Sequence, residues 1–550
     1  MKGCEYIADF LVQHGVTDAF GIPGGVVLDL LYALDARNGI TPHLSYHEQA
    51  AGFAAIGYAQ SIGRLGVAYA TRGPGFTNLI TPIGEAYSES QSVLFITGHV
   101  TPALNEKMRV MADQEFDTCA IVKTITKYAC RVEDVAELPA VLAKAYHEAM
   151  SGRKGPVVLD IAAKVFAGEV NDDVAEESLS MDAFKDVSDI VDAIKKAERP
   201  VLLIGDGVNQ TQKQQEVSLL VEKMQIPVLS SRFSHDVICD SDLYYGYIGS
   251  HGIRYANFVL SKADLIVAIG NRLHFPVNSA SYSQVTERAK IIRIDVDPSE
   301  FERIVPNSQI IEADLRHVVD DLLHSDSDFG NHHEWLKVCK TLRAELNDED
   351  INLGTKQIEK VLTKISNDAT IVADVGNNEF WLSRACVHVN YKGRVLYSKS
   401  FGSLGCGICK AIGTYYATRE PVVCFTGDQG LQMNIQELQF IAQYHLPILI
   451  VLLNNSASGM IKDRELAKYG RYVHTTADSG YGNPDFGKMA DAYGLLYINQ
   501  EVKWNSIQPC LMELTVNSEE GLTPSLPAGK SIQNMVPELE SSMYEKLNAL

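Results

Sequence analysis

The chain has 550 residues, of which 48 are basic and 69 acidic, for a formal net charge of −21. This negative charge argues against nucleic acid or an anionic membrane surface as a partner. The apolar fraction of 46% is typical of a globular protein, and no apolar run approaches the roughly 18 residues of a membrane span. A single hydrophobic core does not extend over a chain of this length, so the length predicts about three domains.

The first residues have an amphipathic helical pattern that places Tyr6, Phe10 and Leu11 on one side. They lack the basic start and apolar core of a signal peptide, so we expect a cytoplasmic protein. The ten cysteines are scattered along the chain, and a large core does not need disulfides, so we expect reduced thiols. Cys406 and Cys409 have the spacing of a metal or redox pair, but no second pair lies near them, which favours structural thiols.

Strands alternate with helical segments along the whole chain. Buried strands are expected at 67–70, 92–97, 156–161, 200–205, 226–229, 265–270, 291–296, 371–374, 422–426 and 448–453. An acidic stretch at 168–177 and a polar run at 324–333 are typical of linkers. This alternation predicts an α/β protein built from doubly wound parallel sheets. We expect three such domains, over residues 1–170, 185–330 and 350–540.

Polar residues follow two strands of the third predicted domain. Asp428 comes after the strand at 421–426, and Asn455 follows the strand at 446–453. Both would lie at the carboxyl ends of parallel strands, where α/β sheets bind ligands. Mg²⁺ takes about six oxygen ligands and often combines a carboxylate with phosphates and water. Asp428, the Asn455 amide and the main-chain carbonyl of Ala457 could supply the protein's share.

Glycines surround this candidate metal site. Gly427 and Gly430 would let the backbone approach a phosphate, and a helix expected from about Leu431 would offer free N–H groups to it. Taken alone, the fragment around Asp428 could be an ordinary turn after a strand. The paired Asn454 and Asn455 at the end of the next strand favour the binding role.

A second acidic signal lies near the start of the chain. Glu48 stands between His47 and a helix of small residues at 50–55. A carboxylate here could cap that helix. It could also act as a buried proton relay, because burial raises the affinity of a carboxylate for its proton.

Together these motifs resemble those of thiamine diphosphate-dependent enzymes, and specifically the acetolactate synthase-like group. The resemblance covers nearly the whole chain. Its segments, in order, are Phe20 to Gly25, His47 to Ala51, Gly73 to Asn78, Ile96 to Gly98, Gln114-Glu115, Ile125 to Lys127, His251-Gly252, Ile294 to Pro298, Gly427-Asp428, Leu431 to Leu438 and Asn454-Asn455. The three predicted domains would then be pyrimidine-binding, central and diphosphate-binding.

The resemblance implies a role for each matching residue. Glu48 would bond the pyrimidine ring nitrogen of the cofactor and serve as the catalytic residue. Asp428, Asn455 and Ala457 would bind Mg²⁺, and Leu404 would hold the cofactor bent. Gln114 would lie at the substrate end, whereas Lys127 is interpreted as a surface lysine. The full set of cofactor-binding residues is Pro23, Gly24, Gly376, Asn377, Asn378, Gly402, Leu404, Gly427, Asp428, Gln429, Gly430, Asn455, Ala457, Gly459 and Met460. Asn377 and Asn378 could equally be turn formers.

Several positions depart from the family pattern. Gln429 follows Asp428 where the family has glycine, so the diphosphate loop must accommodate a side chain. Cys409 replaces the usual proline after the glycine-rich segment 402–407. Residues 271–276 replace the segment with which acetolactate synthases help to hold a flavin, which argues against FAD. The loop after Asn455 lacks the family's bulky residues, which points to a different substrate choice.

The resemblance implies a thiamine diphosphate- and Mg²⁺-dependent enzyme. It would decarboxylate a 2-oxo acid, most simply pyruvate, and join the remaining fragment to a second carbonyl compound. Two alternatives stay open: a decarboxylase that protonates the fragment instead, and a cofactor-binding subunit without turnover. The family also implies a homodimer or homotetramer, because its cofactor spans domains of two subunits. The donor, the acceptor and the pathway are not specified by the sequence.

Overall fold

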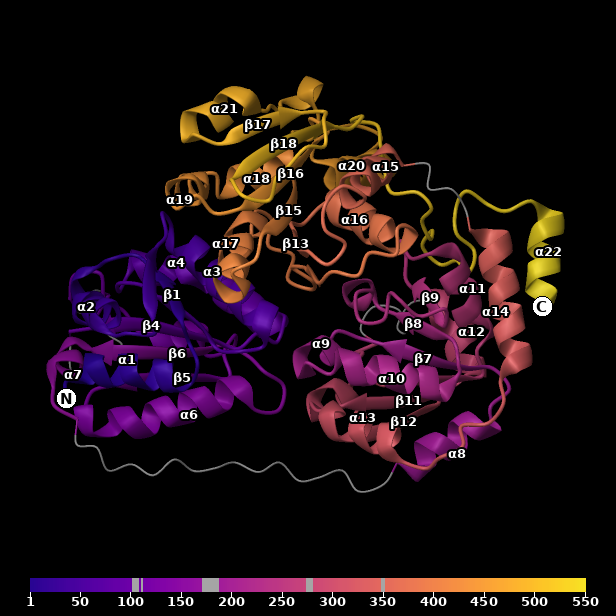
Figure 1. Cartoon of the computed structure of the whole chain (residues 1–550), viewed down its shortest axis with the longest axis horizontal. Coiled ribbons are helices and arrows are strands. Elements are labelled where there is room, and N and C mark those ends of the chain that lie inside the picture. The colour runs from indigo at the N-terminus through magenta and orange to yellow at the C-terminus, as the bar shows by residue number, and fades with distance from the viewer. Residues whose placement is uncertain (101–107, 110–111, 171–186, 274–279, 348–351) are drawn as a thin grey trace. The chain divides into compact units, whose positions relative to one another are not determined.

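The computed structural model describes residues 1–100, 108–109, 112–170, 187–273, 280–347 and 352–550. These residues form two compact units. The first unit comprises Met1–Ser180, Ala369–Glu379 and Val395–Ser518, and the second comprises Met181–Asp368, Phe380–Arg394 and Glu519–Leu550. Three six-stranded parallel sheets hold the strands of the described residues, with helices between successive strands (Figure 1). The predicted α/β class with parallel sheets is therefore confirmed. The linker predicted at 168–177 falls largely outside the described residues.

The first sheet has the strand order β2-β1-β3-β4-β6-β5. Its strands are β1 (Asp18–Gly21), β2 (Thr41–Leu44), β3 (Gly66–Tyr69), β4 (Val93–His99), β5 (Tyr128–Val132) and β6 (Val157–Ala162). The central strands β3, β4 and β6 are buried along their whole length, as expected of a parallel sheet covered on both faces. The accompanying helices are α1 (Gly3–Gln13), α2 (Leu28–Ala36), α3 (Glu48–Ile62), α4 (Pro74–Ser88), α5 (Thr118–Val122), α6 (Leu138–Met150) and α7 (Ala163–Ala167), with 3₁₀ turns at Gly25–Val27 and Val135–Glu137.

The third sheet belongs to the same unit and has the order β14-β13-β15-β16-β18-β17. Its strands are β13 (Thr370–Ala373), β14 (Val395–Leu396), β15 (Val422–Gly427), β16 (Ile448–Asn454), β17 (Leu496–Asn499) and β18 (Cys510–Thr515). Its helices are α16 (Asn377–His388), whose residues from Phe380 belong to the second unit, α17 (Gly407–Thr418), α18 (Asp428–Met433), α19 (Glu437–Gln443), α20 (Gly459–Tyr469) and α21 (Phe486–Tyr493), with a 3₁₀ turn at Ala477–Ser479.

Helices α3 and α17 join the first and third sheets in one hydrophobic core. Glycines permit the close approach of the two helices: a Cβ built on Gly57 would lie 2.2 Å from the carbonyl oxygen of Lys410, and one on Gly413 would lie 1.8 Å from that of Ala54. The side chain of Lys410 forms a fully buried ion pair with Glu85 of α4. Lys410, which directly follows the departing position Cys409, thus has a buried partner of opposite charge.

The second unit is built on the middle sheet, with the order β12-β11-β10-β7-β8-β9. Its strands are β7 (Pro200–Ile204), β8 (Val228–Ser230), β9 (Tyr244–Tyr247), β10 (Leu265–Ile269), β11 (Lys290–Asp295) and β12 (Ser308–Glu312). Its helices are α8 (Ser188–Lys196), α9 (Gly207–Thr211), α10 (Gln214–Met224), α11 (Arg254–Lys262), α12 (Ala280–Arg288), α13 (Leu315–His324), α14 (His333–Leu346), α15 (Leu353–Leu362) and α22 (Ser541–Ala549), with 3₁₀ turns at Arg232–Ser234 and Pro298–Glu302. Helices α10 and α13 cover one face of the sheet, and α11, α14 and α22 pack in the core on the other.

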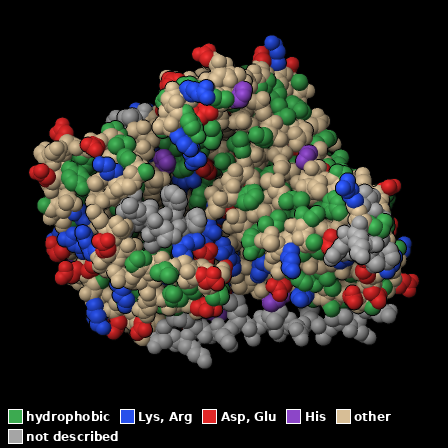
Figure 2. Space-filling model, turned by 180° about the vertical axis from the view of Figure 1, so that it is seen from behind, with side chains coloured by type: hydrophobic (Ala, Val, Ile, Leu, Met, Phe, Trp, Pro, Cys, Tyr) green, Lys and Arg blue, Asp and Glu red, His purple; other side chains and the backbone are tan. Residues whose placement is uncertain are grey.

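The distribution of charged side chains and the state of the cysteines can be compared with what the composition led us to expect. Acidic and basic side chains are interspersed over the face shown in Figure 2. None of the helices in the described part of the chain combines the length and the apolar character needed to cross a bilayer. All ten cysteines are free thiols, and Cys406 and Cys409 are both buried.

Candidate active site

Three neighbouring strands of the third sheet end in polar residues. Asp374 follows β13, Asp428 follows β15 and Asn455 follows β16. The strands pair in the order β13-β15-β16 and are parallel, so their carboxyl ends form one edge of the sheet. This edge is where ligands bind in open α/β sheets.

Asp428 is 2% exposed and begins helix α18 directly after β15. The prediction that this helix starts near Leu431 was wrong by one turn, because Gln429 favours helix and an acidic first residue suits the helix dipole. The Asn483 amide donates to Asp428 Oδ2 at 2.7 Å, and the Gln429 main-chain N–H donates to Oδ1 at 3.0 Å. Burial raises the pKa of Asp428, partly offset by the Asn483 hydrogen bond. Within the described residues, no lysine, arginine or histidine forms an ion pair with this carboxylate.

The loop after β16 bends back toward the sheet edge. Ser456 has a φ of +51°, which non-glycine residues rarely adopt. Beyond this turn, the main-chain N–H of Ala457 donates to Asn455 Oδ1 at 3.3 Å. Asn455 and Ala457 are 8% and 3% exposed. The chain thus turns at Ser456, between the two residues predicted to supply ligands.

Asn377, the first residue of α16, is 6% exposed, and both polar atoms of its side chain lack a hydrogen-bond partner among the described residues. A Cβ built on Gly459 would lie 2.8 Å from Asn377 Nδ2 and 3.0 Å from Asn455 Nδ2. These two amides therefore converge on Gly459. The neighbouring Asn378 differs, because its amide donates to the carbonyl oxygen of Asp374 at 2.7 Å. Of the two predicted contacts, Asn377 is the one with free donors.

Asp374 connects the elements around the edge, a role that the sequence did not indicate. Its carboxylate accepts hydrogen bonds from the Gly405 main-chain N–H and the Thr426 hydroxyl, both at 2.8 Å. Burial raises the pKa of Asp374 to about 6, although these hydrogen bonds favour the charged form. A Cβ on Gly430 would lie 2.7 Å from Asp374 Oδ2. Gly430 is thus needed for packing against Asp374.

The glycine-rich segment is held from both sides. Gly402 and Gly405 have φ values of +71° and +87°, which side-chain-bearing residues rarely adopt. Besides its bond to Asp374, Gly405 accepts a hydrogen bond at 2.9 Å from the Asn434 amide. Leu404 lies between the two glycines and is half-buried. The two hydrogen bonds to Gly405 hold the chain directly after Leu404.

Glu48 is the first residue of α3 and is half-buried. His47 caps this helix, because its ring nitrogen accepts the main-chain N–H of Gln49 at 3.1 Å. The Asn78 amide donates to Glu48 Oε2 at 2.9 Å, and a Cβ built on Gly75 would lie 3.3 Å from Oε1. The cap is therefore formed by another residue, and the Glu48 carboxylate is oriented toward the segment 73–78.

A carboxylate from the third sheet's helices holds the chain just before Glu48. Glu437 of α19 is buried and accepts the Tyr46 main-chain N–H at 3.0 Å. Burial raises the pKa of Glu437 to about 7. Sequence reasoning did not single out Glu437, whose partner lies 391 residues away in the chain.

The remaining predicted residues are more accessible. Pro23 is exposed, and a Cβ on Gly24 would lie 2.3 Å from the Thr71 side chain. Gln114 is exposed with a φ of +60° and packs against Gly73. The half-buried residues of the set are Gly24, Gly376, Leu404, Gly427, Gln429, Gly459 and Met460, and Gly402 is exposed.

The residues at the sheet edge fit a metal diphosphate. A buried carboxylate without a counter-charge needs a cation, and the Asn377 donors need acceptors. Among the described residues no group of three or more His, Cys, Asp and Glu could hold a metal, so a metal here would depend on Asp428 with amide, carbonyl and ligand oxygens. A Cβ built on Gly427 would have only Asn378 Oδ1 within 4 Å, at 3.7 Å, so this glycine leaves room for a phosphate oxygen beside the start of α18.

Comparison with known proteins gives the family. Models of the thiamine pyrophosphate enzymes match residues 1–121 (N-terminal TPP binding domain), 187–322 (central domain) and 374–521 (C-terminal TPP binding domain). The acetolactate synthase large subunit of Lactococcus lactis subsp. lactis is 31% identical over 97% of this chain and 96% of its own length. The chain belongs to the thiamine pyrophosphate enzyme family.

Other relatives of this thiamine pyrophosphate enzyme have similar names. Acetolactate synthase isozyme 2 large subunit of Escherichia coli is 30% identical over 98% of this chain and 100% of its own length. A probable acetolactate synthase large subunit of Methanococcus aeolicus is 29% identical over 100% and 97%. The predicted family is therefore confirmed. The two TPP binding domains are those that contain Glu48 and the Asp428 edge. The flavin prediction rests partly on residues 274–276, which lie outside the described residues.

Proposed function

We propose that this enzyme decarboxylates a 2-oxo acid, pyruvate in the simplest case, and joins the remaining fragment to a second carbonyl compound, with thiamine diphosphate and Mg²⁺ as cofactors. One observation carries the proposal: among the described residues, buried Asp428 has no lysine, arginine or histidine paired with it, and both polar atoms of the buried Asn377 side chain have no hydrogen-bond partner, at the same edge of the sheet. The names of the relatives support carboligation. We expect no flavin, and we place the enzyme in the cytoplasm.

The side chains would divide the work as follows. Asp428, Asn455 and the Ala457 carbonyl would hold Mg²⁺, and the Asn377 amide would donate to a phosphate oxygen. Thiamine diphosphate supplies the electron sink for decarboxylation when bound. Glu48 would hold and move a proton at the pyrimidine ring nitrogen. Its carboxylate is kept in place by Asn78, and the chain just before it by Glu437.

We also propose a homodimer whose sites are shared. Gly75, near the start of α4, faces Glu48, whereas Glu89, just beyond its end, accepts the main-chain N–H of Phe401 at 3.0 Å. At about 1.5 Å per residue, the helix separates these points by about 20 Å. A pyrimidine ring held at Gly402 would then lie nearer the Glu89 end of α4 than the Glu48 end. We propose that the partner's Glu48 reaches it, and a twofold axis would create two such sites.

Product analysis tests the activity. Purified protein with thiamine diphosphate and Mg²⁺ is incubated with a panel of 2-oxo acids and aldehydes, and products are identified by mass. Carbon dioxide release with a ligated product is expected from pyruvate. Accumulation of free aldehyde would instead show a simple decarboxylase. Absence of carbon dioxide from every 2-oxo acid, with bound cofactor demonstrated, would contradict the proposal.

Subunit mixing tests the shared site. The variants Glu48→Gln and Asp428→Ala are each expected to be inactive. After dissociation and reassociation in equal amounts, heterodimers should regain one intact site, or up to about a quarter of all sites under random pairing. No recovery, despite proven subunit exchange, would refute the shared-site arrangement.

A further inference from the structure

A polar pocket of about 370 Å³ lies in the second unit and is lined by none of the residues assigned to the active site. Arg199 immediately precedes β7, Lys262 ends α11 and Arg288 ends α12, so the pocket is at the amino ends of the strands of the middle sheet. The C-terminal segment, including Gln533 and Tyr544, forms the other wall. Ligands of α/β sheets normally bind at the opposite, carboxyl edge. This pocket therefore needs a separate explanation.

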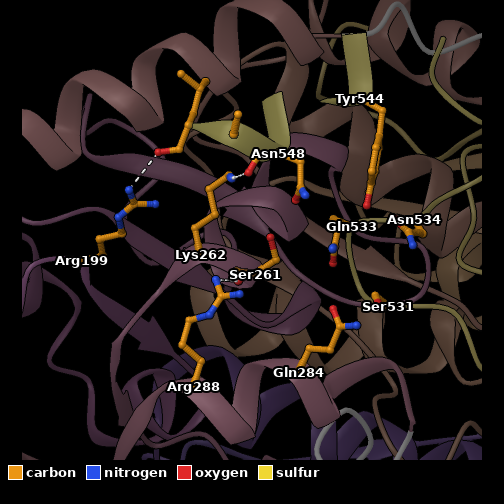
Figure 3. A pocket seen from close by; sticks show the side chains of 12 residues that line it. Arg199, Ser261, Lys262, Gln284, Arg288, Ser531, Gln533, Asn534, Tyr544 and Asn548 are labelled. Atoms are coloured by element: carbon orange, nitrogen blue, oxygen red, sulfur yellow. Dashed lines mark hydrogen bonds between the residues drawn. The ribbon is translucent and has the colours of Figure 1, made fainter. Parts of the chain in front are cut away.

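The pocket concentrates positive charge. The side chains of Arg199, Lys262 and Arg288 come from three elements and are all drawn at the pocket in Figure 3. Lys262 and Arg288 donate to the main-chain oxygens of Asn548 at 3.0 Å and Ser261 at 2.9 Å. Arg199 donates to an oxygen of Leu550, the last residue in the sequence, at 2.8 Å. No aspartate or glutamate of the described residues lines the pocket. In a chain of net charge −21, such a cluster favours an anionic ligand.

Lys262 shows the effect of this charge most clearly. It is 5% exposed. Burial lowers its pKa to about 8, and the charges of Arg199 and Arg288 act in the same direction. A buried ammonium group without a carboxylate partner is costly, and a bound anion would relieve that cost.

The rest of the lining offers neutral hydrogen-bonding groups. Gln533 is 9% exposed, and its Oε1 has no partner among the described residues; Asn534 Oδ1 is also buried without one. These oxygens accept hydrogen bonds, so they suit the hydroxyl groups of a ligand rather than its phosphate. Ser261, Ser531 and Tyr544 add hydroxyl groups to the wall. Because the wall is almost wholly polar, a flat apolar ligand is a poor fit.

We propose that this pocket binds a small phosphorylated polyol, with the phosphate held by Lys262 and Arg288 and the ligand hydroxyls held by Gln533 and Asn534. Arginine and lysine are the usual partners of phosphate groups. The volume lies within the range of small-molecule sites. A bound ligand would bridge α11 and α12 to the C-terminal segment. The site is independent of the thiamine diphosphate site and of the proposed function.

Calorimetry on the full chain, without thiamine diphosphate, tests the proposal. Glucose 6-phosphate is expected to bind, inorganic phosphate to bind more weakly, and glucose not to bind. Arg288→Gln should weaken glucose 6-phosphate binding about tenfold or more, because it removes a charge-assisted hydrogen bond. Arg288 is exposed, so this variant should fold. Lys290→Gln is the matched control, because Lys290 is exposed and close in the chain but outside the pocket.

A second variant tests the contacts to the ligand hydroxyls separately from the contacts to the phosphate. Gln533→Leu should weaken the binding of glucose 6-phosphate without changing the affinity for inorganic phosphate. Failure of both phosphates to bind at millimolar concentrations would overturn the proposal, and so would equal weakening by Arg288→Gln and Lys290→Gln. Tighter binding of citrate than of glucose 6-phosphate would overturn the assignment of a phosphate ligand.

Discussion

Replacing Gly459 by alanine should weaken the binding of thiamine diphosphate and leave the fold intact. The added Cβ would lie 2.8 Å from Asn377 Nδ2 and 3.0 Å from Asn455 Nδ2. Contacts this short force the two amides to move. The backbone itself accepts alanine, because Gly459 begins α20 and is not among the residues with positive φ. Alanine in place of glycine in a helix is favourable by about 0.5–1 kcal/mol at interior positions, so stability should be unchanged or slightly higher.

The loss of affinity can be estimated from the contacts. A hydrogen bond to a charged group contributes about 1.5–3 kcal/mol. Displacing the Asn377 amide should therefore lower the affinity for thiamine diphosphate about 10- to 150-fold. Titration calorimetry with Mg²⁺ present measures this directly. Gly482→Ala is the control, because a Cβ there meets no atom within 4 Å and its φ is not positive.

A double-mutant cycle identifies the cause. If Gly459→Ala acts by displacing Asn377, then Asn377→Ala should produce a similar loss, and the double variant should lose little more than either. Wild-type affinity in a folded Gly459→Ala variant would refute the assignment of Asn377 and Asn455 to the site. Fully additive losses would show that Gly459 acts through other groups.

Two further predictions concern Gln429 and Glu437. Gln429→Gly should tighten thiamine diphosphate binding if the side chain crowds the phosphate and weaken it if the amide contacts the phosphate; unchanged affinity in calorimetry would show that it points away. The folded-state pKa of Glu437 is raised from 4.5 to about 7, so the folded protein binds this proton more tightly than the unfolded chain does. The free energy of unfolding should therefore fall as the pH rises from about 4.5 through 7, by about 3 kcal/mol at most. Glu437→Gln should remove this dependence, and identical pH profiles of thermal unfolding in both proteins would contradict the burial argument.

The long apolar strands were predictable from the sequence. The predicted strands at 422–426 and 448–453 correspond to β15 and β16 within one residue at each end, because buried runs bounded by polar residues carry a strong signal. Strands such as β14, with two residues, and β17, which is half-exposed, carry no such signal. The start of α18 was misplaced because Gly427 and Gly430 were interpreted as parts of a loop that approaches a phosphate.

The contacts that organise the site were harder to find. Asp374 was noted only as the end of a strand, yet it joins residues 31 and 52 positions away. Asn483, the donor to Asp428, lies 55 residues further along the chain, and the sequence did not indicate this contact. The residues at 519–550 pack with the middle sheet although they follow the third sheet in the chain. Such partners are brought together by the fold, and no local pattern marks them.

The most direct test of the account is the exchange of the thiazolium C2 proton of bound thiamine diphosphate with deuterium. If Glu48 activates the cofactor through the pyrimidine nitrogen, the exchange should be fast in the wild-type holoenzyme and slower by orders of magnitude in Glu48→Gln, with the affinity for thiamine diphosphate retained. The variant Glu5→Gln, at an exposed position in α1, should exchange as the wild type does. Equal exchange rates in the wild type and Glu48→Gln, with cofactor bound to both, would contradict the central claim.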